Sequence, residues 1–493
     1  MVDVLLTHSY FLRFDRKEHR AMMPYPPLGT LYAASVLRRS GITVALHDTM
    51  LASSEEELLD AIEVHQPKIV AIYDDQFNYL TKMCLERMRR AAFRMTGLAK
   101  GRGCKVVVFS SDATDHIQKY IDHGADFVLC GEAEETLQEL SEVLLGRSLT
   151  PVEDIRGVAY SEGASIRRTQ SRNVITDLNA FPFPAWDLVD GPRYRSAWRR
   201  HGLFSLNMVT TRGCPYHCNW CAKPIYGQVY HSRTPHNVVD EMLLVRERLA
   251  PDHLWFADDI FGLKPGWIGT FAGEVERAKA QIPFKCLSRV DLLLREENVK
   301  HLKRAGCESV WVGAESGSQK ILDAMEKGTT TEQIRQATAL LHAQGIRVGF
   351  FLQFGYPGET QSDIDQTLDM VRDCRPENVG ISVSYPLPGT RFYERVRAEL
   401  RTKTNWTESA DLDLMFAGEF KPEFYRILHR ITHKKLRIWQ AQGALKELVV
   451  ESRLPGHGEA FRLVKSLYHA ATLPPLQWRL RSAARQSNRQ AAV

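Results

Sequence analysis

The feature that most constrains the fold is an alternation of short β-branched runs with helical segments, which occurs twice along the chain. In the first series, Leu28, Leu31 and Val36 lie at helical spacing in a segment that Gly41 ends. Strands are predicted at residues 2–8, 42–48, 68–74, 105–111 and 126–130. Because this alternation is typical of a parallel, doubly wound sheet, residues 1–148 are predicted to form a Rossmann-like α/β domain.

A second series of six βα units begins at Ser205. Its strands are predicted at residues 205–211, 253–258, 284–289, 309–314, 347–354 and 379–384. Six such units predict a partial TIM-type (β/α)6 barrel over residues 205–400, with its active site at the carboxyl ends of the strands. Between the two series, Pro182, Pro184 and Pro192 predict that residues 149–204 form a linker with one or two short strands.

The pattern of residues 401–493 is helical and irregular, which predicts a helical C-terminal region. From Arg426 to the last residue there are 13 Lys and Arg but only 3 Asp and Glu, so this region ends in a basic tail. A solvated terminal helix is sufficient to explain the charge. An anionic substrate and a membrane surface are the alternatives.

Composition excludes several classes of protein. With 44% hydrophobic and 25% charged residues, a chain of 493 residues is neither mainly disordered nor collagen-like. The net charge of +5 gives no argument for nucleic acid, so none is expected as a partner. No secretory signal and no uncharged apolar run of transmembrane length is visible. The nine cysteines are odd in number and six of them are widely scattered, so they do not fit a disulfide framework, which favours a reducing, cytoplasmic compartment.

The sharpest motif is TTRGCPYHCNWCAKPIYG, in which Cys214, Cys218 and Cys221 follow the first predicted barrel strand. Three thiolates on one loop can bind three corners of a 4Fe-4S cluster and leave one iron open. A structural zinc site would need a fourth Cys or His, and His217 is poorly placed for this because it lies between two of the cysteines. The spacing therefore favours a cluster over zinc.

The position of this motif at the end of the first strand of a six-unit βα barrel resembles the radical S-adenosylmethionine (radical SAM) superfamily, over about residues 205–400. The resemblance implies that the open iron chelates the amino and carboxylate groups of SAM. It also implies an external electron donor such as flavodoxin or ferredoxin. Reductive cleavage of SAM would then yield methionine and a 5′-deoxyadenosyl radical.

The resemblance also implies contacts to SAM from several strand ends. Trp220 matches an aromatic position near the adenine, although core packing also explains a tryptophan. Asp258 and Asp259 stand where the family holds the SAM amino group, and a surface turn or helix cap is the alternative. Arg289 suits the SAM carboxylate, but it suits a structural ion pair equally well.

Two later motifs extend the implied SAM site. In VGAESGSQKIL, Glu315 and Ser316 resemble the region that contacts the ribose and the sulfonium, while Ser316 could equally cap the following helix. In QFGYPGET, Gly355 and Pro357 belong to a segment that permits close backbone approach to a planar base. This segment is expected on the adenine side.

The motifs PPLGTLYAASVLRRSG and GADFVLCGEAEETL, in a Rossmann-like domain before such a barrel, resemble the cobalamin-binding class of radical SAM enzymes. Cobalamin is therefore the third implied cofactor, although the Asp-x-His-x-x-Gly motif of histidine-ligated cobalamin is absent. Dinucleotide binding is the rival, but the first turn lacks Gly-x-Gly-x-x-Gly. Candidate cobalamin contacts at strand ends are Ser110, Ser111, Asp112, Thr114, Gly131 and Glu132. A capped helix start also explains the first four.

Together these resemblances imply methylation of an unactivated carbon of a small-molecule substrate, with SAM serving both as radical source and as methyl donor to cobalamin. The alternative is oxidative ring formation with the same cofactors, as in anaerobic porphyrin cyclases. A tRNA methylthiotransferase would need a second cluster, from Cys84, Cys104 and Cys130, and a terminal β-barrel that the helical pattern does not suggest. A cluster-bearing sensor would be expected to lack intact SAM-side motifs.

Overall fold

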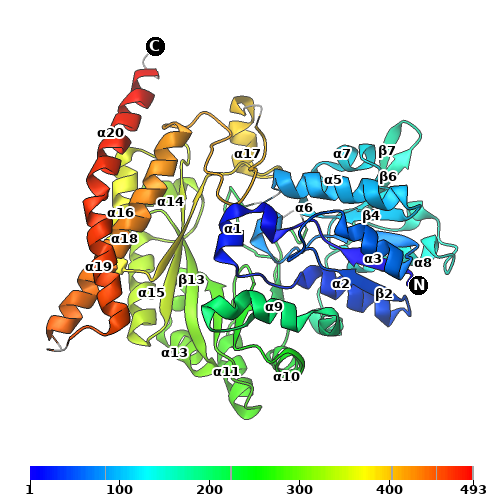
Figure 1. Cartoon of the computed structure of the whole chain (residues 1–493), viewed down its shortest axis with the longest axis horizontal. Helices are drawn as coiled ribbons and strands as arrows, with labels where there is room; N and C mark the ends of the chain where they lie inside the picture. Colours follow the sequence, from blue (N-terminus) through cyan, green and yellow to red (C-terminus); the bar gives the residue numbers. More distant parts are fainter. Residues whose placement is uncertain (84, 222–224, 401–402, 451, 453, 491–493) are drawn as a thin grey trace. The chain divides into compact units, whose positions relative to one another are not determined.

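The computed structural model describes residues 1–83, 85–221, 225–400, 403–450, 452 and 454–490 (Figure 1). The chain divides into two compact units. The first unit comprises Met1–Tyr216, Lys223–Cys286 and Asn405–Asp411. The second comprises His217–Ala222, Leu287–Thr404 and Leu412–Val493.

The first unit contains a seven-stranded sheet in the order β2-β1-β3-β4-β5-β6-β7. Its strands are β1 (Val4–Thr7), β2 (Val44–His47), β3 (Ile69–Tyr73), β4 (Lys105–Phe109), β5 (Phe127–Leu129), β6 (Val158–Glu162) and β7 (Ser165–Arg168). The first five are parallel, and the last two join antiparallel. The order 2-1-3-4-5 is that of a doubly wound sheet, so the predicted Rossmann-like fold is confirmed.

Helices cover this sheet, which is why β1 and β3 are buried at every position. The helices of this part of the chain are α1 (Arg16–Ala21), α2 (Leu28–Arg39), α3 (Glu57–His65), α4 (Tyr79–Lys82), α5 (Glu86–Gly101), α6 (Ser111–Asp115), α7 (Ile117–Asp122) and α8 (Glu134–Leu144). In α2, the helix predicted from Leu28 onward, ten of the twelve residues are buried. The core of the domain therefore lies between the sheet and these helices.

Residues 149–204 contain the short strands β6 and β7, and also a helix, α9 (Gly191–Trp198), that the prolines did not suggest. Pro192 lies in the first turn of α9, where its missing N–H leaves no helical hydrogen bond unmade. The Asp190 side chain caps the helix by accepting from the backbone N–H of Arg193. Here proline starts a helix instead of breaking one.

All six strands predicted for the barrel are present, in a second sheet ordered β15-β14-β13-β12-β11-β8. They are β8 (Ser205–Met208), β11 (His253–Phe256), β12 (Phe284–Ser288), β13 (Cys307–Glu315), β14 (Arg347–Phe354) and β15 (Asn378–Val383). The described pairings are parallel. β12 contributes residues to both units. Sequential parallel strands joined by helices form a half-barrel, which confirms the predicted partial (β/α)6 fold.

The helices between the barrel strands are α10 (Pro235–Leu249), α11 (Trp267–Arg277), α12 (Val290–Leu293), α13 (Glu296–Ala305), α14 (Gln319–Ala324), α15 (Thr331–Ala343) and α16 (Gln361–Cys374). Capping boxes start two of them, since Thr330 pairs with Gln333 before α15 and Thr360 pairs with Asp363 before α16. These caps fix where the chain turns from a strand end into the next helix.

The first barrel strand is shorter than predicted. β8 ends at Met208, and Thr211–Arg212 forms a separate strand, β9, that pairs antiparallel with β10 (His231–Ser232). The strand breaks because the backbone N–H groups of Thr210 and Thr211 donate to the Asp258 carboxylate instead of to a neighbouring strand. We call residues 213–230, between β9 and β10, the cysteine loop.

The C-terminal region is helical, as predicted. It contains α17 (Arg391–Val396), α18 (Pro422–Val450), α19 (His457–Ala471) and α20 (Leu473–Gln490). α18 packs against α16 and also contacts α19 and α20, so the three last helices lie side by side (Figure 1, orange to red). Within the described residues, no helix is both long enough and apolar enough to cross a membrane.

Candidate functional site

The turn before the cysteine loop is held by Asp258, which lies just beyond β11. Its buried carboxylate accepts hydrogen bonds from the backbone N–H groups of Thr210 and Thr211, at 2.7 Å each. It also accepts from the two threonine hydroxyls, at 2.9 and 2.8 Å. Burial raises the pKa of Asp258 to about 6, although these donors act in the opposite direction. Asp258 therefore directs the chain out of β8.

The two aspartates of the predicted SAM amino-group site have different surroundings. Asp258 is buried and accepts from Thr210 and Thr211, whereas Asp259 is exposed and pairs with Lys82 at 2.7 Å. A contact between either carboxylate and SAM stays a prediction. Asp258 also has a structural role, because it holds the turn at Thr210 and Thr211.

Arg212, two residues before Cys214, anchors the first end of the cysteine loop. Its buried guanidinium pairs with Glu132 and, at 2.8 Å, with Glu134. It also lies 4.6 Å from the centre of the Phe181 ring, a cation–π contact. Glu132 is one of the predicted cobalamin contacts. One buried cation therefore joins residues 131–134, which follow β5, to the start of the cysteine loop.

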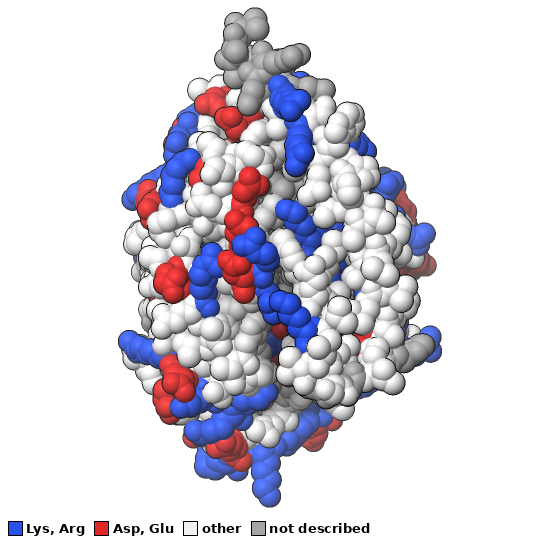
Figure 2. Space-filling model, turned by 90° about the vertical axis from the view of Figure 1, so that its left-hand side faces the viewer, with Lys and Arg blue, Asp and Glu red and all other residues white. Residues whose placement is uncertain are grey.

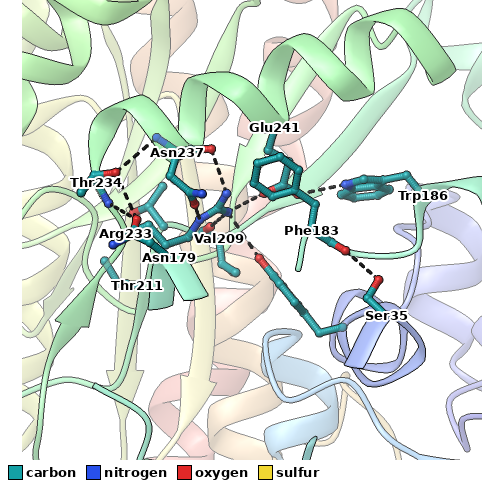
Figure 3. Close-up of polar contacts among 12 residues, drawn as sticks. Ser35, Asn179, Phe183, Trp186, Val209, Thr211, Arg233, Thr234, Asn237 and Glu241 are labelled. Atoms are coloured by element: carbon teal, nitrogen blue, oxygen red, sulfur yellow. Dashed lines mark hydrogen bonds and ion pairs between the residues drawn. The ribbon is translucent and has the colours of Figure 1, made fainter. Parts of the chain in front are cut away.

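Arg233 anchors the other end of the loop, directly after β10 (Figure 3). Its guanidinium pairs with Glu241 of α10 and donates to the Val209 carbonyl at 2.9 Å and to Asn237 Oδ1 at 2.6 Å. Glu241, fully buried, also accepts from Trp186 Nε1 at 2.9 Å. Removing one partner of such a buried pair strongly destabilises a protein, so both ends of the loop have a fixed geometry.

Asn219, between Cys218 and Cys221, fixes the middle of the loop within the second unit. Its backbone N–H donates to the Met325 carbonyl at 3.1 Å, and its side-chain amide donates to the Ala324 carbonyl at 2.8 Å. The side-chain oxygen accepts from the Tyr356 hydroxyl at 3.0 Å. Because Tyr356 belongs to QFGYPGET, these contacts join that motif to the cysteine motif.

Lys327 brings together three residues of the predicted SAM site, Trp220, Arg289 and Glu315. Its Nζ lies 2.7 Å from Glu315 Oε1 and 5.9 Å from the centre of the Trp220 ring. Its carbonyl accepts from Arg289 Nη2 at 3.3 Å. A Cβ at Gly313 would lie 2.5 Å from both Glu315 Oε1 and Lys327 Nζ, so glycine makes room for this ion pair.

The charge of Lys327 is also stabilised by its neighbours. Burial acts to lower the pKa of Lys327, but the negative charges of the Glu315 carboxylate and of an ionised Cys218 outweigh it and raise the pKa above its usual value. Lys327 is therefore a largely buried cation near the second cysteine of the motif.

Glu315 has a left-handed backbone conformation, with φ of +57°, which is unusual for a residue with a side chain. The following Ser316 is fully buried, and its Oγ accepts from the backbone N–H of Ser318 at 3.1 Å. It also lies 3.2 Å from Thr367 Oγ1. Ser316 thus turns the chain just before α14, and its predicted contact with SAM stays a prediction.

The QFGYPGET segment has a backbone that requires glycine at Gly355, where φ is +77° and a Cβ would lie 2.9 Å from Leu414. The Gly355 N–H donates to Glu359 Oε2 at 2.6 Å. Burial raises the pKa of Glu359 to about 8, so this carboxyl is neutral near pH 7. Pro357 is partly exposed. The predicted adenine contact of Gly355 and Pro357 is not tested by these interactions.

The candidate cobalamin residues after β4 form a capped helix start, which was the alternative explanation. Ser110 caps α6 by accepting from the Ala113 N–H at 2.9 Å, and Thr114 donates back to the Ser110 carbonyl at 3.0 Å. Asp112 is buried and bound by Arg89, with a 2.7 Å contact to Oδ2. Ser111 is buried, and Gly131 follows β5 with φ of +79°. Their contact with cobalamin stays a prediction.

Four buried polar groups at strand ends and in the cysteine loop indicate where ligands would fit. The hydroxyls of Thr7 and Tyr73, the last residues of β1 and β3, have no hydrogen-bond partner among the described residues. The same holds for Trp220 Nε1 and for Ser288 Oγ at the end of β12. Because buried polar groups rarely stay unpaired, these atoms favour external ligands at the carboxyl ends of the strands. The residues present therefore fit both a SAM-type and a corrin-type cofactor.

The three cysteines of the motif are thiols, partly buried at Cys214 and Cys218 and exposed at Cys221. The described residues contain no group of three or more His, Cys, Asp or Glu side chains placed to bind one metal ion. In a 4Fe-4S cluster each thiolate binds a different iron, so the cysteines need not converge on one point. The three free cysteines of this loop are the type of ligand that such a cluster requires. Ligation by these cysteines stays a prediction. Cys84, considered above for a second cluster, lies outside the described residues.

Sequence reasoning missed Arg212, Asn219, Arg233 and Lys327. Arg212 and Asn219 lie inside the cysteine motif, so their position next to the cysteines was the available signal. Arg233 and Lys327 act through partners that are distant in sequence or lie in another element, and no spacing rule identifies them.

The half-barrel and the cysteine loop have the features of a radical SAM domain. Residues 208–371 match the family described as the Radical SAM superfamily, so this stretch of the chain is a radical SAM domain. The chain thus contains a radical SAM domain, as the cysteine motif predicted.

Three relatives illustrate the range of similar proteins. An uncharacterized methyltransferase of Pyrococcus horikoshii is 26% identical over 400 residues, which cover 79% of this chain and 82% of the relative. The hopanoid C-3 methylase of Methylococcus capsulatus is 25% identical over 437 residues, 84% of this chain and 78% of the relative. The anaerobic magnesium-protoporphyrin IX monomethyl ester cyclase of Rubrivivax gelatinosus is 26% identical over 274 residues, 55% and 49% of the two chains.

Two solved structures share the fold. OxsB, described as a cobalamin-dependent SAM radical enzyme with aqua-cobalamin bound, matches with a TM-score of 0.70 and 18% identity, covering 97% of this chain and 72% of OxsB. The methyltransferase TsrM of Kitasatospora setae, solved with cobalamin and a [4Fe-4S] cluster, matches with a TM-score of 0.66 and 19% identity, covering 81% and 75% of the two chains. The chain therefore has the fold of cobalamin-dependent radical SAM enzymes, as the two N-terminal motifs predicted.

Proposed function

We propose that this chain is a cobalamin-dependent radical SAM methyltransferase that adds a methyl group to an unactivated carbon of a small molecule. The observation that carries the proposal is the order of two parts in one chain. A doubly wound sheet precedes a radical SAM half-barrel whose first strand leads into a loop with three thiols. This order matches the fold of OxsB and TsrM, and relatives that cover most of the chain include methyltransferases.

In this proposal, Cys214, Cys218 and Cys221 hold a 4Fe-4S cluster, and an external donor such as flavodoxin or ferredoxin reduces it. When bound, the cluster and SAM supply a carbon-centred radical, and cobalamin supplies the methyl group. SAM would lie against Trp220 and the strand-end residues Asp258, Asp259, Arg289, Glu315, Ser316, Gly355 and Pro357. Cobalamin would lie at the carboxyl ends of β1, β3, β4 and β5.

The chain's own residues mainly hold these groups in place and exclude water. Arg212, Arg233 and Asp258 fix the two ends of the cysteine loop, and Asn219 fixes its middle. Lys327 supplies a buried positive charge beside Cys218, where thiolates and a carboxylate would otherwise accumulate negative charge.

The test is anaerobic reconstitution of the full chain with iron, sulfide and hydroxocobalamin, followed by incubation with SAM and a low-potential reductant. We expect bound corrin, cluster absorption and formation of 5′-deoxyadenosine. With the correct substrate, S-adenosylhomocysteine and 5′-deoxyadenosine should both form with each methylated product. The variant Cys218→Ala should lose cluster absorption, whereas Cys130→Ala, outside the motif, should keep it. A product formed without S-adenosylhomocysteine would rule out methyl transfer.

The second candidate is oxidative ring formation with the same cofactors, which the similarity to the Rubrivivax gelatinosus cyclase favours. The two candidates differ in the mass of the product. A methyltransferase increases the mass of its substrate by one CH₂ group, which is about 14 Da. A cyclase removes hydrogen and adds no carbon, so mass spectrometry of the product distinguishes them.

A further inference from the structure

The C-terminal helices expose apolar side chains to a degree that no other region matches. Of the 13 large hydrophobic residues that are exposed in the described structure, nine lie between residues 445 and 478. On α19, Phe461, Val464, Leu467 and Tyr468 are 64%, 66%, 69% and 63% exposed. We call these four residues the α19 face. Large contiguous apolar patches on a protein surface mark interaction sites.

The α19 face is one side of an amphipathic helix. At about 100° per residue, its four side chains lie within about 120° of the helix circumference. Leu463 and Ser466, which lie on another side, are partly buried, and α19 contacts both α18 and α20. The helix is thus held through its inner side while its apolar outer side faces solvent. Exposed apolar residues continue on neighbouring segments at Leu445, Val449, Val450, Leu454 and Trp478.

Basic side chains flank this apolar surface. Arg462 and Lys465 are exposed on α19, and Arg481 and Arg485 are exposed on α20. Glu459 is the single acidic residue in the sequence from 457 to 490. Figure 2 shows this side of the molecule, where Lys and Arg side chains, with some Asp and Glu among them, lie beside broad uncharged areas. Apolar residues bordered by Lys and Arg are typical of helices that lie in the interface of an anionic membrane.

We propose that α19 and α20 form a docking surface for a membrane that contains anionic lipids. The apolar residues of the α19 face would enter the boundary between headgroups and acyl chains, and the basic side chains would contact lipid phosphates. Since no described helix is long and apolar enough to cross a bilayer, the helices would lie on the membrane. This surface is independent of the proposed function, because it uses none of the cofactor residues.

Charge favours a lipid surface over a second copy of the chain. A symmetric contact between two α19 faces would bring Arg462, Lys465, Arg481 and Arg485 of one copy near the same residues of the other. Like charges in such an interface repel, because eight Lys and Arg face only three Glu, at positions 447, 451 and 459, in the sequence from 445 to 490. Nucleic acid would satisfy the basic side chains but would leave the aliphatic residues Val464 and Leu467 in water.

The test is co-sedimentation of the full chain with vesicles. One set contains phosphatidylcholine with about 30% phosphatidylglycerol, and the other contains phosphatidylcholine alone. We expect at least about tenfold stronger partitioning onto the anionic vesicles, falling when salt is raised from about 0.1 to 0.5 M. Equal partitioning onto both vesicle types, or none onto either, would overturn the proposal.

Two variants separate the apolar and the ionic contributions. Val464→Glu with Leu467→Glu should lower partitioning about tenfold or more, because two charges would enter the headgroup boundary. The matched control is Val64→Glu, at a valine 73% exposed in the first unit, and it should change partitioning less than about twofold. Circular dichroism should show an unchanged fold, since the substituted side chains are exposed. Unchanged partitioning of the double variant would contradict the proposal.

For the ionic contribution, Arg462, Lys465, Arg481 and Arg485 are all changed to Gln. The control changes the exposed Arg102, Arg156, Arg199 and Arg248 to Gln, so that net charge falls equally. Only the first set should abolish the preference for anionic vesicles. If both sets act alike, the attraction is unspecific and the surface is not a docking site. If light scattering instead shows a dimer that the double glutamate variant dissociates, the partner is a second copy and the proposal is wrong.

Discussion

The base of the cysteine loop and the α19 face break the usual distribution of residues in opposite ways. At the two ends of this loop, Arg212 and Arg233 are charged but buried. Arg212 pairs with two buried glutamates and Arg233 with one. On the α19 face, Phe461 and Leu467 are apolar but exposed. Buried charges with complete internal partners fix a geometry within the protein. Exposed apolar side chains have no such internal partner, and they indicate a partner outside it.

The largest expected effect concerns Arg212. The substitution Arg212→Met leaves Glu132 and Glu134 buried near each other without their cation, which should cost about 3–5 kcal/mol of stability. Urea unfolding followed by circular dichroism measures this cost. The exposed control Arg102→Met should change stability by less than about 0.5 kcal/mol.

A triple variant sharpens this result. When Glu132→Gln and Glu134→Gln are added to Arg212→Met, no buried carboxylate remains at this point and much of the stability should return. If Arg212→Met alone unfolds as wild type does, the pair does not stabilise the loop base. The proposed contrast between the buried charges at the cysteine loop and the exposed apolar residues of the α19 face would then be wrong.

The second prediction concerns Glu359, a buried acid that accepts a hydrogen bond from the Gly355 N–H. The pKa of Glu359 is about 8 in the folded chain and near 4.5 in the unfolded chain. Between pH 4.5 and pH 8, this carboxyl is therefore ionised only in the unfolded chain. Its contribution to stability is complete below pH 4.5 and falls as pH rises, by about 1.4 kcal/mol per pH unit, until pH 8.

The variant Glu359→Gln removes this titration while keeping an acceptor for the Gly355 N–H. Between pH 5.5 and 7.5, wild type should therefore lose about 2–3 kcal/mol relative to the variant. Urea unfolding at both pH values measures the difference, and the exposed control Glu153→Gln should show almost none. A constant difference at the two pH values would mean that Glu359 is ionised throughout.

Periodicity predicted the fold well, because strand burial and helix amphipathicity are local properties of the sequence. Every strand proposed for both sheets is present, and β14 has the predicted bounds, Arg347–Phe354. The break after β8 was missed, because it depends on Asp258, which lies 47 residues beyond Thr211. Arg233 and Lys327 were missed because their partners Glu241 and Glu315 lie in other elements of the fold. A charged residue shows its role only when the partners that bury it are known.

The third prediction concerns Lys327 in the second unit, which, like Arg212 and Arg233, is a cation paired with a glutamate. In reconstituted protein, Lys327→Met should lower the reduction potential of a cluster at the cysteine loop by about 50–100 mV. This shift corresponds to a cation worth about 1–2 kcal/mol at an effective dielectric constant near 20. Potentiometric titration with spectroscopic detection measures it.

Two variants control for the loss of folding. Lys327→Arg keeps the charge and should hold the potential close to that of wild type, whereas Lys303→Met removes an exposed charge and should leave it unchanged. Equal potentials for Lys327→Met and Lys327→Arg would show that the charge does not act on the cluster. The buried cation would then serve only to pair with Glu315.

The smallest expected effect is on the α19 face and tests the other half of the comparison. Because Val464 is 66% exposed, Val464→Glu buries no charge and should change the free energy of unfolding by less than about 0.5 kcal/mol. Val371 of α16 is fully buried, so Val371→Glu places the same carboxylate in the core and should cost several times more. Thermal unfolding of both variants measures the contrast. A large loss of stability in Val464→Glu would mean that the α19 face packs inside the protein, and the case for an external partner would disappear with it.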